Sequence, residues 1–305
     1  MTQLATYLLS IIMIINFVLA FTVIFLERKN ASSTWAWLMV LFFIPVVGFF
    51  LYLIFGRRLS GQRLFKMDSK SKLGVKTAVQ KQLNDLKKGK FSLRQEELMQ
   101  YKDLYYLHLK HNDAILTQNN DVTLFTDGKD KFNALIEDLK GAKDHIHLLY
   151  YIMRNDDLGQ QIGDILVQKA KEGVMVRVLY DDLGSRKLGC RYKKRLKDAG
   201  VEIEGFFPPR IPRFNLKINF RNHRKLAIID GKIGYIGGFN IGDEYLGKSK
   251  KFGYWRDTHL RIYGEAVANM QTRFILDWNQ ASRNDILYDD RYYNVDPSGD
   301  VGIQI

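Results

Sequence analysis

The chain has 305 residues, 46% of them hydrophobic, and a formal net charge of +13. This length allows one large or two modest domains. The excess of base favours an anionic partner, either phospholipid headgroups or nucleic acid. Cys190 is the single cysteine, which excludes an intrachain disulfide and suits a reducing, cytosol-facing compartment.

Two long uncharged stretches lie at the N-terminus, Leu4 to Leu26 and Trp35 to Phe55. Each is long enough to cross ~30 Å of hydrocarbon as a helix. A signal peptide is the alternative for the first stretch, but a basic n-region is missing and a second apolar stretch follows at once. The sequence therefore predicts a two-helix transmembrane hairpin over residues 1–60.

Basic residues gather after the predicted hairpin. Arg57 and Arg58 close the second stretch, and ten Lys or Arg stand against four Asp or Glu from Lys66 to Lys102. The positive-inside rule then places the rest of the chain in the cytoplasm, as part of a cell-membrane protein with two spans. We expect residues 61–115 to form a basic juxtamembrane linker, either solvated or lying on anionic lipid.

Strand and helix patterns alternate through residues 116–305. Strand-like segments cover 122–125, 145–153, 174–180 and 201–207, and helix-like segments cover 130–143, 158–173 and 188–200. This alternation predicts an α/β sheet covered on both faces. After a proline-bearing loop at 206–221, we expect a hairpin, a strand at 257–264 and a helix at 266–281.

The stretch NHRKLAIIDGKIGYIGGFN, residues 222–240, contains the candidate site. Side chains alternate along a strand, so His223 and Lys225 share a face. Asp230 and Gly231 form a strong hairpin turn, and a two-residue loop there would place Gly238 opposite His223. The bare glycine would then leave room for a ligand. Asn240 would end the return strand close by.

An imidazole, an ammonium and a carboxamide around a small hollow suit phosphodiester chemistry. Imidazole can attack phosphorus and form a covalent phospho-histidine. Lysine and asparagine can donate hydrogen bonds to the phosphoryl oxygens. Lys225, Asn240 and Gly238 are therefore the candidate phosphate-binding residues. No carboxylate cluster or metal-ligand spacing accompanies His223, so we expect neither a metal nor another cofactor.

The pattern H-x-K-x₄-D followed by G-x-x-G-G-x-N resembles the signature of the phospholipase D superfamily. The residues that fit it are His223, Lys225, Asp230, Gly237, Gly238 and Asn240. The segments HIHLLYYIMRNDDLG and YWRDTHLRIYGEAVANMQTRFILDW, together with the apolar hairpin, resemble the bacterial cardiolipin synthases of that superfamily.

This resemblance implies an α/β sandwich half-domain and an enzyme of phospholipid biosynthesis. Its reaction would be phosphatidyl transfer between two phosphatidylglycerol molecules, giving cardiolipin and glycerol. The resemblance also implies catalytic roles for three residues. His223 would be the nucleophile, Lys225 a phosphate ligand, and Asp230 the support of an active-site imidazole.

The sequence departs from this family in carrying one such motif instead of two. We therefore expect the membrane hairpin plus the first motif-bearing half, which would need a second motif from a homodimer or from another half. A membrane-tethered single-motif nuclease dimer and a catalytically inactive half are the alternatives. The apolar hairpin and the aromatic-rich flanks favour lipid over nucleic acid as the partner.

Five further residues lie in or near the predicted strands. We expect His145, His147 and His259 to be packed or hydrogen-bonded and not metal ligands. Arg221 and Asn222 either contact substrate or lie on a basic surface.

Overall fold

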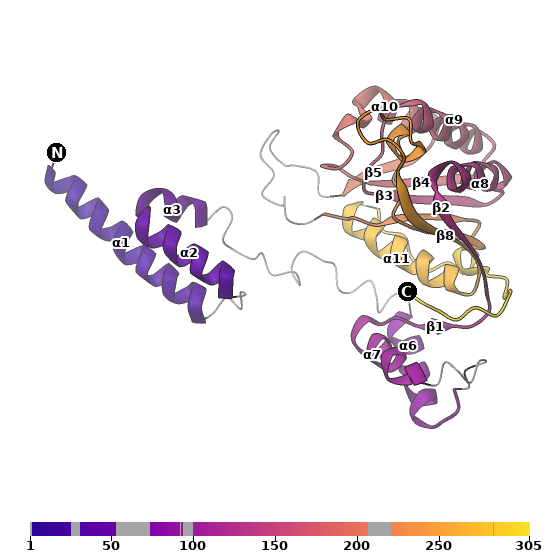
Figure 1. Cartoon of the computed structure of the whole chain (residues 1–305), viewed down its shortest axis with the longest axis horizontal. Helices are drawn as coiled ribbons and strands as arrows, with labels where there is room; N and C mark the ends of the chain where they lie inside the picture. The colour runs from indigo at the N-terminus through magenta and orange to yellow at the C-terminus, as the bar shows by residue number, and fades with distance from the viewer. Residues whose placement is uncertain are drawn as a thin grey trace. The chain divides into compact units, whose positions relative to one another are not determined.

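The computed structural model describes residues 2–25, 31–52, 74–91, 93, 100–206, 221–282 and 284–305. It divides into two compact units, Met1–Lys66 and Met67–Ile305 (Figure 1). Most of the predicted loop at 206–221 and part of the predicted basic linker lie outside the described residues.

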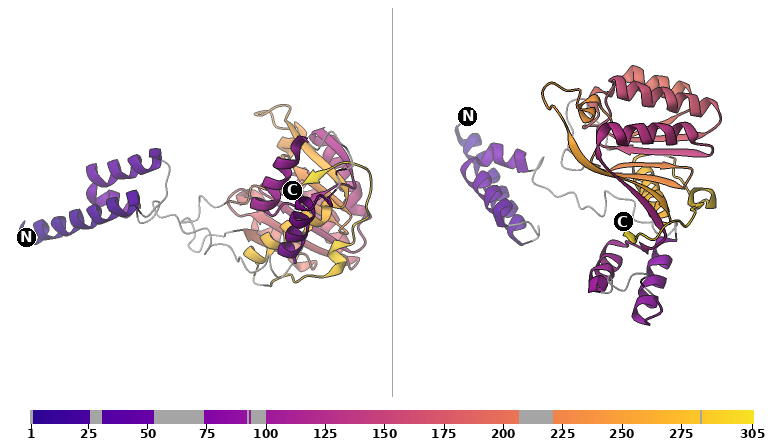
Figure 2. Two further views of the ribbon diagram at one scale, coloured as in Figure 1. Left: turned by 90° about the horizontal axis from the view of Figure 1, so that it is seen from below. Right: turned by 45° about the vertical axis from the view of Figure 1, so that its right-hand side comes forward.

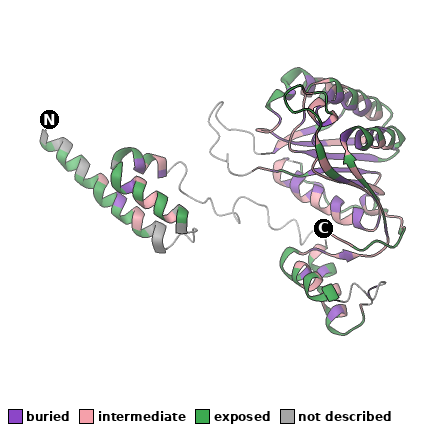
Figure 3. Ribbon diagram, viewed as in Figure 1, coloured by how far each residue is buried: buried purple, intermediate pink, exposed green. Residues whose placement is uncertain are grey.

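The described residues of the first unit form the helices α1 (Thr2–Phe25), α2 (Ala31–Phe43) and α3 (Pro45–Leu51). Pro45 suits the first turn of α3, where its missing N–H would have no helical partner. Most of the described side chains in these helices are exposed (Figure 3). Among the residues that the structure describes, none of the helices is both long enough and apolar enough to span a membrane, so the predicted two spans are not confirmed.

The second unit is built on a seven-stranded sheet with the order β2-β8-β7-β6-β3-β4-β5. The pairs β3–β4 and β4–β5 are parallel, and the other neighbours are antiparallel. The strands are β2 (Asn120–Asp127), β3 (His145–Tyr150), β4 (Met175–Asp181), β5 (Glu202–Phe206), β6 (Lys225–Ile229), β7 (Ile233–Gly237) and β8 (Arg256–Gly264). The predicted α/β alternation is confirmed.

Helices cover both faces of this sheet (Figures 1 and 2). One face packs against α8 (Gly128–Gly141), α9 (Asp157–Lys171) and α10 (Cys190–Asp198). The other packs against α11 (Ala266–Ala281). All residues of β3 and β6 are buried, as expected for central strands that are covered on both sides. The candidate site therefore begins at the end of a rigid, fully buried strand.

Smaller elements complete the second unit. Helices α6 (Val75–Lys87) and α7 (Lys102–Asn112) pack together through Val79, Leu86 and Leu109. Strand β1 (Leu116–Thr117) pairs antiparallel with β9 (Ile303–Gln304). The described residues also form the short 3₁₀ helices η3 (Arg186–Leu188), η4 (Asp243–Leu246) and η5 (Asp290–Tyr293).

The buried Asn120 side chain joins the start of β2 to two distant segments. Its Oδ1 accepts from Ala266 N at 2.7 Å, and its Nδ2 donates to Val301 O at 2.9 Å. Asn120→Ala leaves the N–H of the buried Ala266 unsatisfied, at about 1–3 kcal/mol. We predict a clear fall in Tm of the full chain, at roughly 2–4 °C per kcal/mol. The exposed Asn155→Ala is the control, and equal Tm values for the two variants would contradict the prediction.

Candidate active site

The central feature of the site is a contact between Lys225, the first residue of β6, and His223, two residues before it. The Lys225 Nζ lies 2.9 Å from His223 Nδ1 and donates to the His223 carbonyl oxygen at 2.7 Å. The centroids of the Tyr151 and His223 rings lie 4.2 Å apart. Lys225 Nζ lies 5.3 Å from the centroid of the Tyr151 ring. The structure thus brings the two predicted residues together and adds an aromatic neighbour.

Burial sets the charge state of this pair. Lys225 is 5% exposed, and burial lowers its pKa to about 8, with the Asp257 carboxylate acting in the opposite direction. Burial, and then the Lys225 charge, lower the pKa of the exposed His223 ring, while Asp181 opposes the shift. Near neutral pH the imidazole is therefore neutral and the lysine is largely charged.

The charge on Lys225 fixes the tautomer of the histidine. A protonated lysine can only donate hydrogen bonds, so His223 Nδ1 accepts from Nζ. The neutral ring must then carry its proton on Nε2. A protonated Nε2 has no free lone pair, so it cannot act as a nucleophile until the proton moves.

The hairpin that follows differs from the prediction by one residue. Ile229 pairs with Ile233, so three residues, 230–232, connect β6 to β7 instead of two. The expected placement of Gly238 opposite His223 is therefore wrong by one position. A Cβ on Gly238 would lie 1.9 Å from Asp257 Oδ1, so the space beside this glycine is filled by a carboxylate.

Asp230 lies at the opposite end of β6 from His223. Its carboxylate accepts hydrogen bonds from the backbone N–H groups of Lys143, Asp144 and His145 at 2.8–3.2 Å. Its own backbone adopts a left-handed conformation with φ 54°. The structure does not bring Asp230 to the His223 imidazole, and the carboxylate instead fastens the hairpin turn to the start of β3.

Asn240 lies just beyond β7 and is 5% exposed. Its Oδ1 accepts from Ile152 N at 2.9 Å, and its Nδ2 donates to the Tyr245 hydroxyl at 2.8 Å. Its amide therefore joins the segment after β7 to the segment after β3. One Nδ2 proton remains for a ligand.

Two carboxylates at this end of the sheet are not predicted from the sequence. Asp257, at the start of β8, lies against Gly238, and its charge acts to raise the pKa of Lys225. Asp181, the last residue of β4, is 1% exposed and accepts from Asn222 N at 3.0 Å. The position of Asp181 at the carboxyl end of a buried parallel strand is a usable signal, because ligand sites gather at that edge.

Asn222 and Arg221 anchor the approach to His223. Asn222 is 2% exposed, and its Oδ1 accepts from the Arg224 backbone and guanidinium at 3.3 Å. An Arg221 nitrogen lies 3.9 Å from Asp181 Oδ1. These contacts favour an internal role for Asn222 over a place on a basic surface.

The three remaining histidines of the sheet are fully buried. His145 Nδ1 contacts Asp144 at 2.6 Å, and His147 contacts Gln271 and Arg177. The rings of His259 and Phe239 stack with centroids 6.1 Å apart. The predicted packed and hydrogen-bonded roles are confirmed. Within the described ranges, no group of three or more His, Cys, Asp or Glu could hold a metal ion.

Comparison with known families defines the class of this domain. The phospholipase D-like domain model of cardiolipin synthase matches residues 135–278, which contain the candidate site. A second model, the phospholipase D-nuclease N-terminal domain, matches residues 14–57. The second unit thus has a phospholipase D-like fold.

Curated relatives extend the match over nearly the whole chain. Cardiolipin synthase of Oceanobacillus iheyensis is 61% identical over 98% of this chain and 62% of its own length. Major cardiolipin synthase ClsA of Bacillus subtilis is 52% identical over 99% of this chain and 63% of its own. The chain is similar to these cardiolipin synthases and carries a phospholipase D-like domain, and it spans a little over three-fifths of the length of these relatives.

Among solved structures, phosphatidylserine synthase of Haemophilus influenzae matches with a TM-score of 0.44 and 20% identity, over 54% of this chain and 38% of its own. A phospholipase D family member, Nuc from Salmonella typhimurium, matches with a TM-score of 0.41 and 17% identity, over 55% of this chain and 99% of its own.

The electrostatics of the site can be tested by titrating Lys225. NMR of ¹³C-labelled lysines, assigned with Lys225→Arg, should give a pKa near 8, well below the ordinary value of roughly 10.4. Asp257→Asn should lower this pKa further, because the carboxylate stabilises the charged lysine. Asp198→Asn, which removes an exposed carboxylate on α10, should leave it unchanged. An ordinary pKa, or a rise in Asp257→Asn, would refute this electrostatic account.

Proposed function

We propose that this chain carries a phosphatidyltransferase site that condenses two phosphatidylglycerol molecules into cardiolipin and glycerol. The observation that carries the proposal is the contact between His223 and Lys225 at the exposed end of β6. Similarity to proteins named cardiolipin synthase supports the choice of substrate.

The proposed reaction has two displacements at phosphorus. His223 Nε2 attacks the phosphodiester of the first phosphatidylglycerol and forms a P–N bond. The bond from phosphorus to the glycerol oxygen breaks, and that oxygen takes up a proton as glycerol leaves. A hydroxyl of the second phosphatidylglycerol then attacks phosphorus and loses its proton, the P–N bond breaks, and cardiolipin is released. Splitting the transfer in this way replaces one difficult step with two easier ones.

Lys225 prepares both the phosphate and the nucleophile. Its ammonium occupies the lone pair on His223 Nδ1, which leaves the proton on Nε2. A bound phosphodiester offers anionic oxygens that attract this ammonium more strongly than a neutral nitrogen does. Once Lys225 turns to the phosphate, the proton can move to Nδ1 and Nε2 becomes free to attack. The remaining Nδ2 proton of Asn240 donates to the same phosphate.

The reaction also needs a proton donor for the departing glycerol. General acid catalysis contributes roughly 10²–10⁴ in rate. A second motif supplies this group in the proposed assembly, either from a second copy of this chain in a homodimer or from another motif-bearing half. We assign residues 116–305 to the first such half.

Activity should therefore depend on assembly. The isolated chain as a monomer should make little cardiolipin, and synthesis should appear when self-association or an added second half supplies the missing group. In the assembled form His223→Ala should abolish turnover, and Lys225→Ala should reduce it by about 10²–10³, the scale measured for one removed oxyanion donor. The measurement is lipid synthesis against chain concentration, with EDTA present. Robust turnover by a demonstrated monomer, or by His223→Ala, would rule out this catalytic unit.

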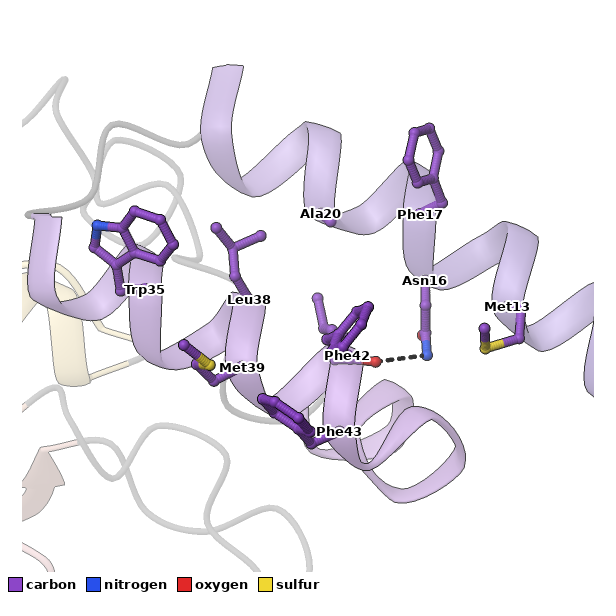
Figure 4. Close-up of a pocket in the computed structure, with 10 residues that line it drawn as sticks. Met13, Asn16, Phe17, Ala20, Trp35, Leu38, Met39, Phe42 and Phe43 are labelled. Atoms are coloured by element: carbon purple, nitrogen blue, oxygen red, sulfur yellow. Dashed lines mark hydrogen bonds between the residues drawn. The ribbon is translucent and has the colours of Figure 1, made fainter.

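We further infer that residues 1–60 hold the chain at a phospholipid membrane and that residues 61–115 link them to the phospholipase D-like domain. Large apolar side chains are exposed on the described helices of the first unit, including Phe17 at 78% and Phe42 at 77%. A hollow of about 460 Å³ between α1 and α2 is lined almost entirely by apolar side chains (Figure 4). Its polar group, Asn16, donates to the Leu41 carbonyl at 3.2 Å. Hydrocarbon suits such a surface better than water does.

The proposed topology has two spans and a cytoplasmic catalytic domain. The exposed Cys190 on α10 is a natural probe of this arrangement. In intact cells it should resist a membrane-impermeant thiol reagent, and it should react after the cells are opened. Cys190→Ser gives the background signal. Ready labelling of intact cells would reverse the proposed orientation.

A further inference from the structure

An exposed basic and aromatic segment lies between η4 and β8. Residues 247–254, here called the 247–254 loop, have the sequence GKSKKFGY. Phe252 is 49% exposed and Tyr254 is 67% exposed, and Lys248, Lys250 and Lys251 are also exposed. In both views of Figure 2 the orange segment that precedes β8 loops out beyond the body of the second unit.

The 247–254 loop has a defined conformation. Gly253 N donates to Ser249 O at 2.8 Å, which closes one turn. Gly247 and Gly253 adopt positive φ angles of 73° and 63°, which glycine accepts without strain. The Phe252 ring meets the Trp255 ring edge-on at 5.6 Å. The exposed aromatic side chains are therefore presented by a turn that is packed against the domain.

Ring contacts connect this loop to the candidate site. Trp255 packs against Tyr245 with centroids 4.9 Å apart. The Tyr245 hydroxyl accepts from Asn240, one of the candidate phosphate ligands. Asp257, two residues after Trp255, lies against Gly238. Whatever binds the loop is thus held beside the site where the phosphodiester would react.

The chemistry of the loop matches the surface of an anionic bilayer. Aromatic rings favour the interface, where an apolar body and a polar edge can both be accommodated. Lysine side chains can lay their apolar stems along such a surface and keep the ammonium among the headgroups. Lys248 contacts Asp157 and Asp243, but no carboxylate among the described residues pairs with Lys250 or Lys251. Each basic residue near anionic lipid strengthens binding by roughly fivefold.

We propose that the 247–254 loop docks onto the anionic phospholipid surface, with Phe252 and Tyr254 in the interface and Lys250 and Lys251 on the headgroups. This contact holds the candidate site close to the lipid layer. It is independent of the proposed chemistry, because the loop binds through side chains that take no part in the reaction.

The test must report on the loop itself, because the first unit is also expected to bind membranes. The full chain carries Cys190→Ser and a single new cysteine, Ser249→Cys, labelled with a polarity-sensitive fluorophore. It is reconstituted in vesicles of phosphatidylglycerol and phosphatidylcholine that contain nitroxide-labelled lipid. The matched control is Lys140→Cys on α8. The first residue of this helix, Gly128, lies against the Tyr245 backbone, close to the 247–254 loop, and Lys140 is twelve residues further along. The control position therefore lies roughly 18 Å along the helix from Gly128.

The Ser249 probe should shift its emission to shorter wavelength and be quenched by the labelled lipid, and the Lys140 probe should not. Vesicles of phosphatidylcholine alone, or the double variant Lys250→Gln with Lys251→Gln, should weaken the quenching. Phe252→Ser with Tyr254→Ser should abolish the emission shift. His223→Ala should leave the quenching unchanged, so that failure of the docking and failure of the chemistry are distinguished.

Three results would overturn the proposal. The first is equal quenching of the two probes. The second is an emission shift that grows with the number of chains per vesicle and is not accompanied by lipid quenching, which would indicate contact with a second copy of the chain. The third is a shift that added DNA produces and lipid does not, which would indicate a nucleic-acid contact.

Discussion

The site depends on one physical constraint, the burial of the Lys225 ammonium at the end of the central strand. A buried charge is costly unless polar partners replace water. The His223 carbonyl and Nδ1 accept from this ammonium, the Tyr151 ring lies beside it, and the Asp257 carboxylate offsets part of the burial. These partners fix the position of the imidazole. The same burial lowers the pKa of the lysine to about 8.

Polar side chains away from the reacting atoms hold the strand ends in place. Asp230 fastens one end of β6 to β3, and Asp181 fastens the chain before the other end to β4. Asn240 joins the segment after β7 to the segment after β3. Each group accepts from backbone N–H groups that would otherwise lack partners near a strand end. The ends of the strands that carry the site are therefore held by specific hydrogen bonds.

The sequence predicted those features that follow from local periodicity. Strand alternation predicted that His223 and Lys225 share a face. The structure brings the two into contact, but β6 begins at Lys225 and His223 lies before the strand. The hairpin register was missed, because one extra residue in the connection at 230–232 moves every cross-strand partner. Asp257 was missed because its contact with Gly238 arises from the pairing of β7 with β8, which no local pattern reveals. The resemblance implies a catalytic role for Asp230. In the structure this residue lies in the hairpin turn, and its carboxylate accepts from backbone N–H groups at the start of β3.

The central claim is that His223 forms a covalent bond to phosphorus, and direct detection of the adduct tests it best. The chain, assembled with a second motif, is mixed with isotopically labelled phosphatidylglycerol and quenched in alkali, where phospho-histidine survives. Mass spectrometry of the peptides should find the phosphatidyl or phosphoryl group on His223 during turnover and not in His223→Ala. Turnover without any adduct on His223, or with the adduct on another residue, would contradict the account.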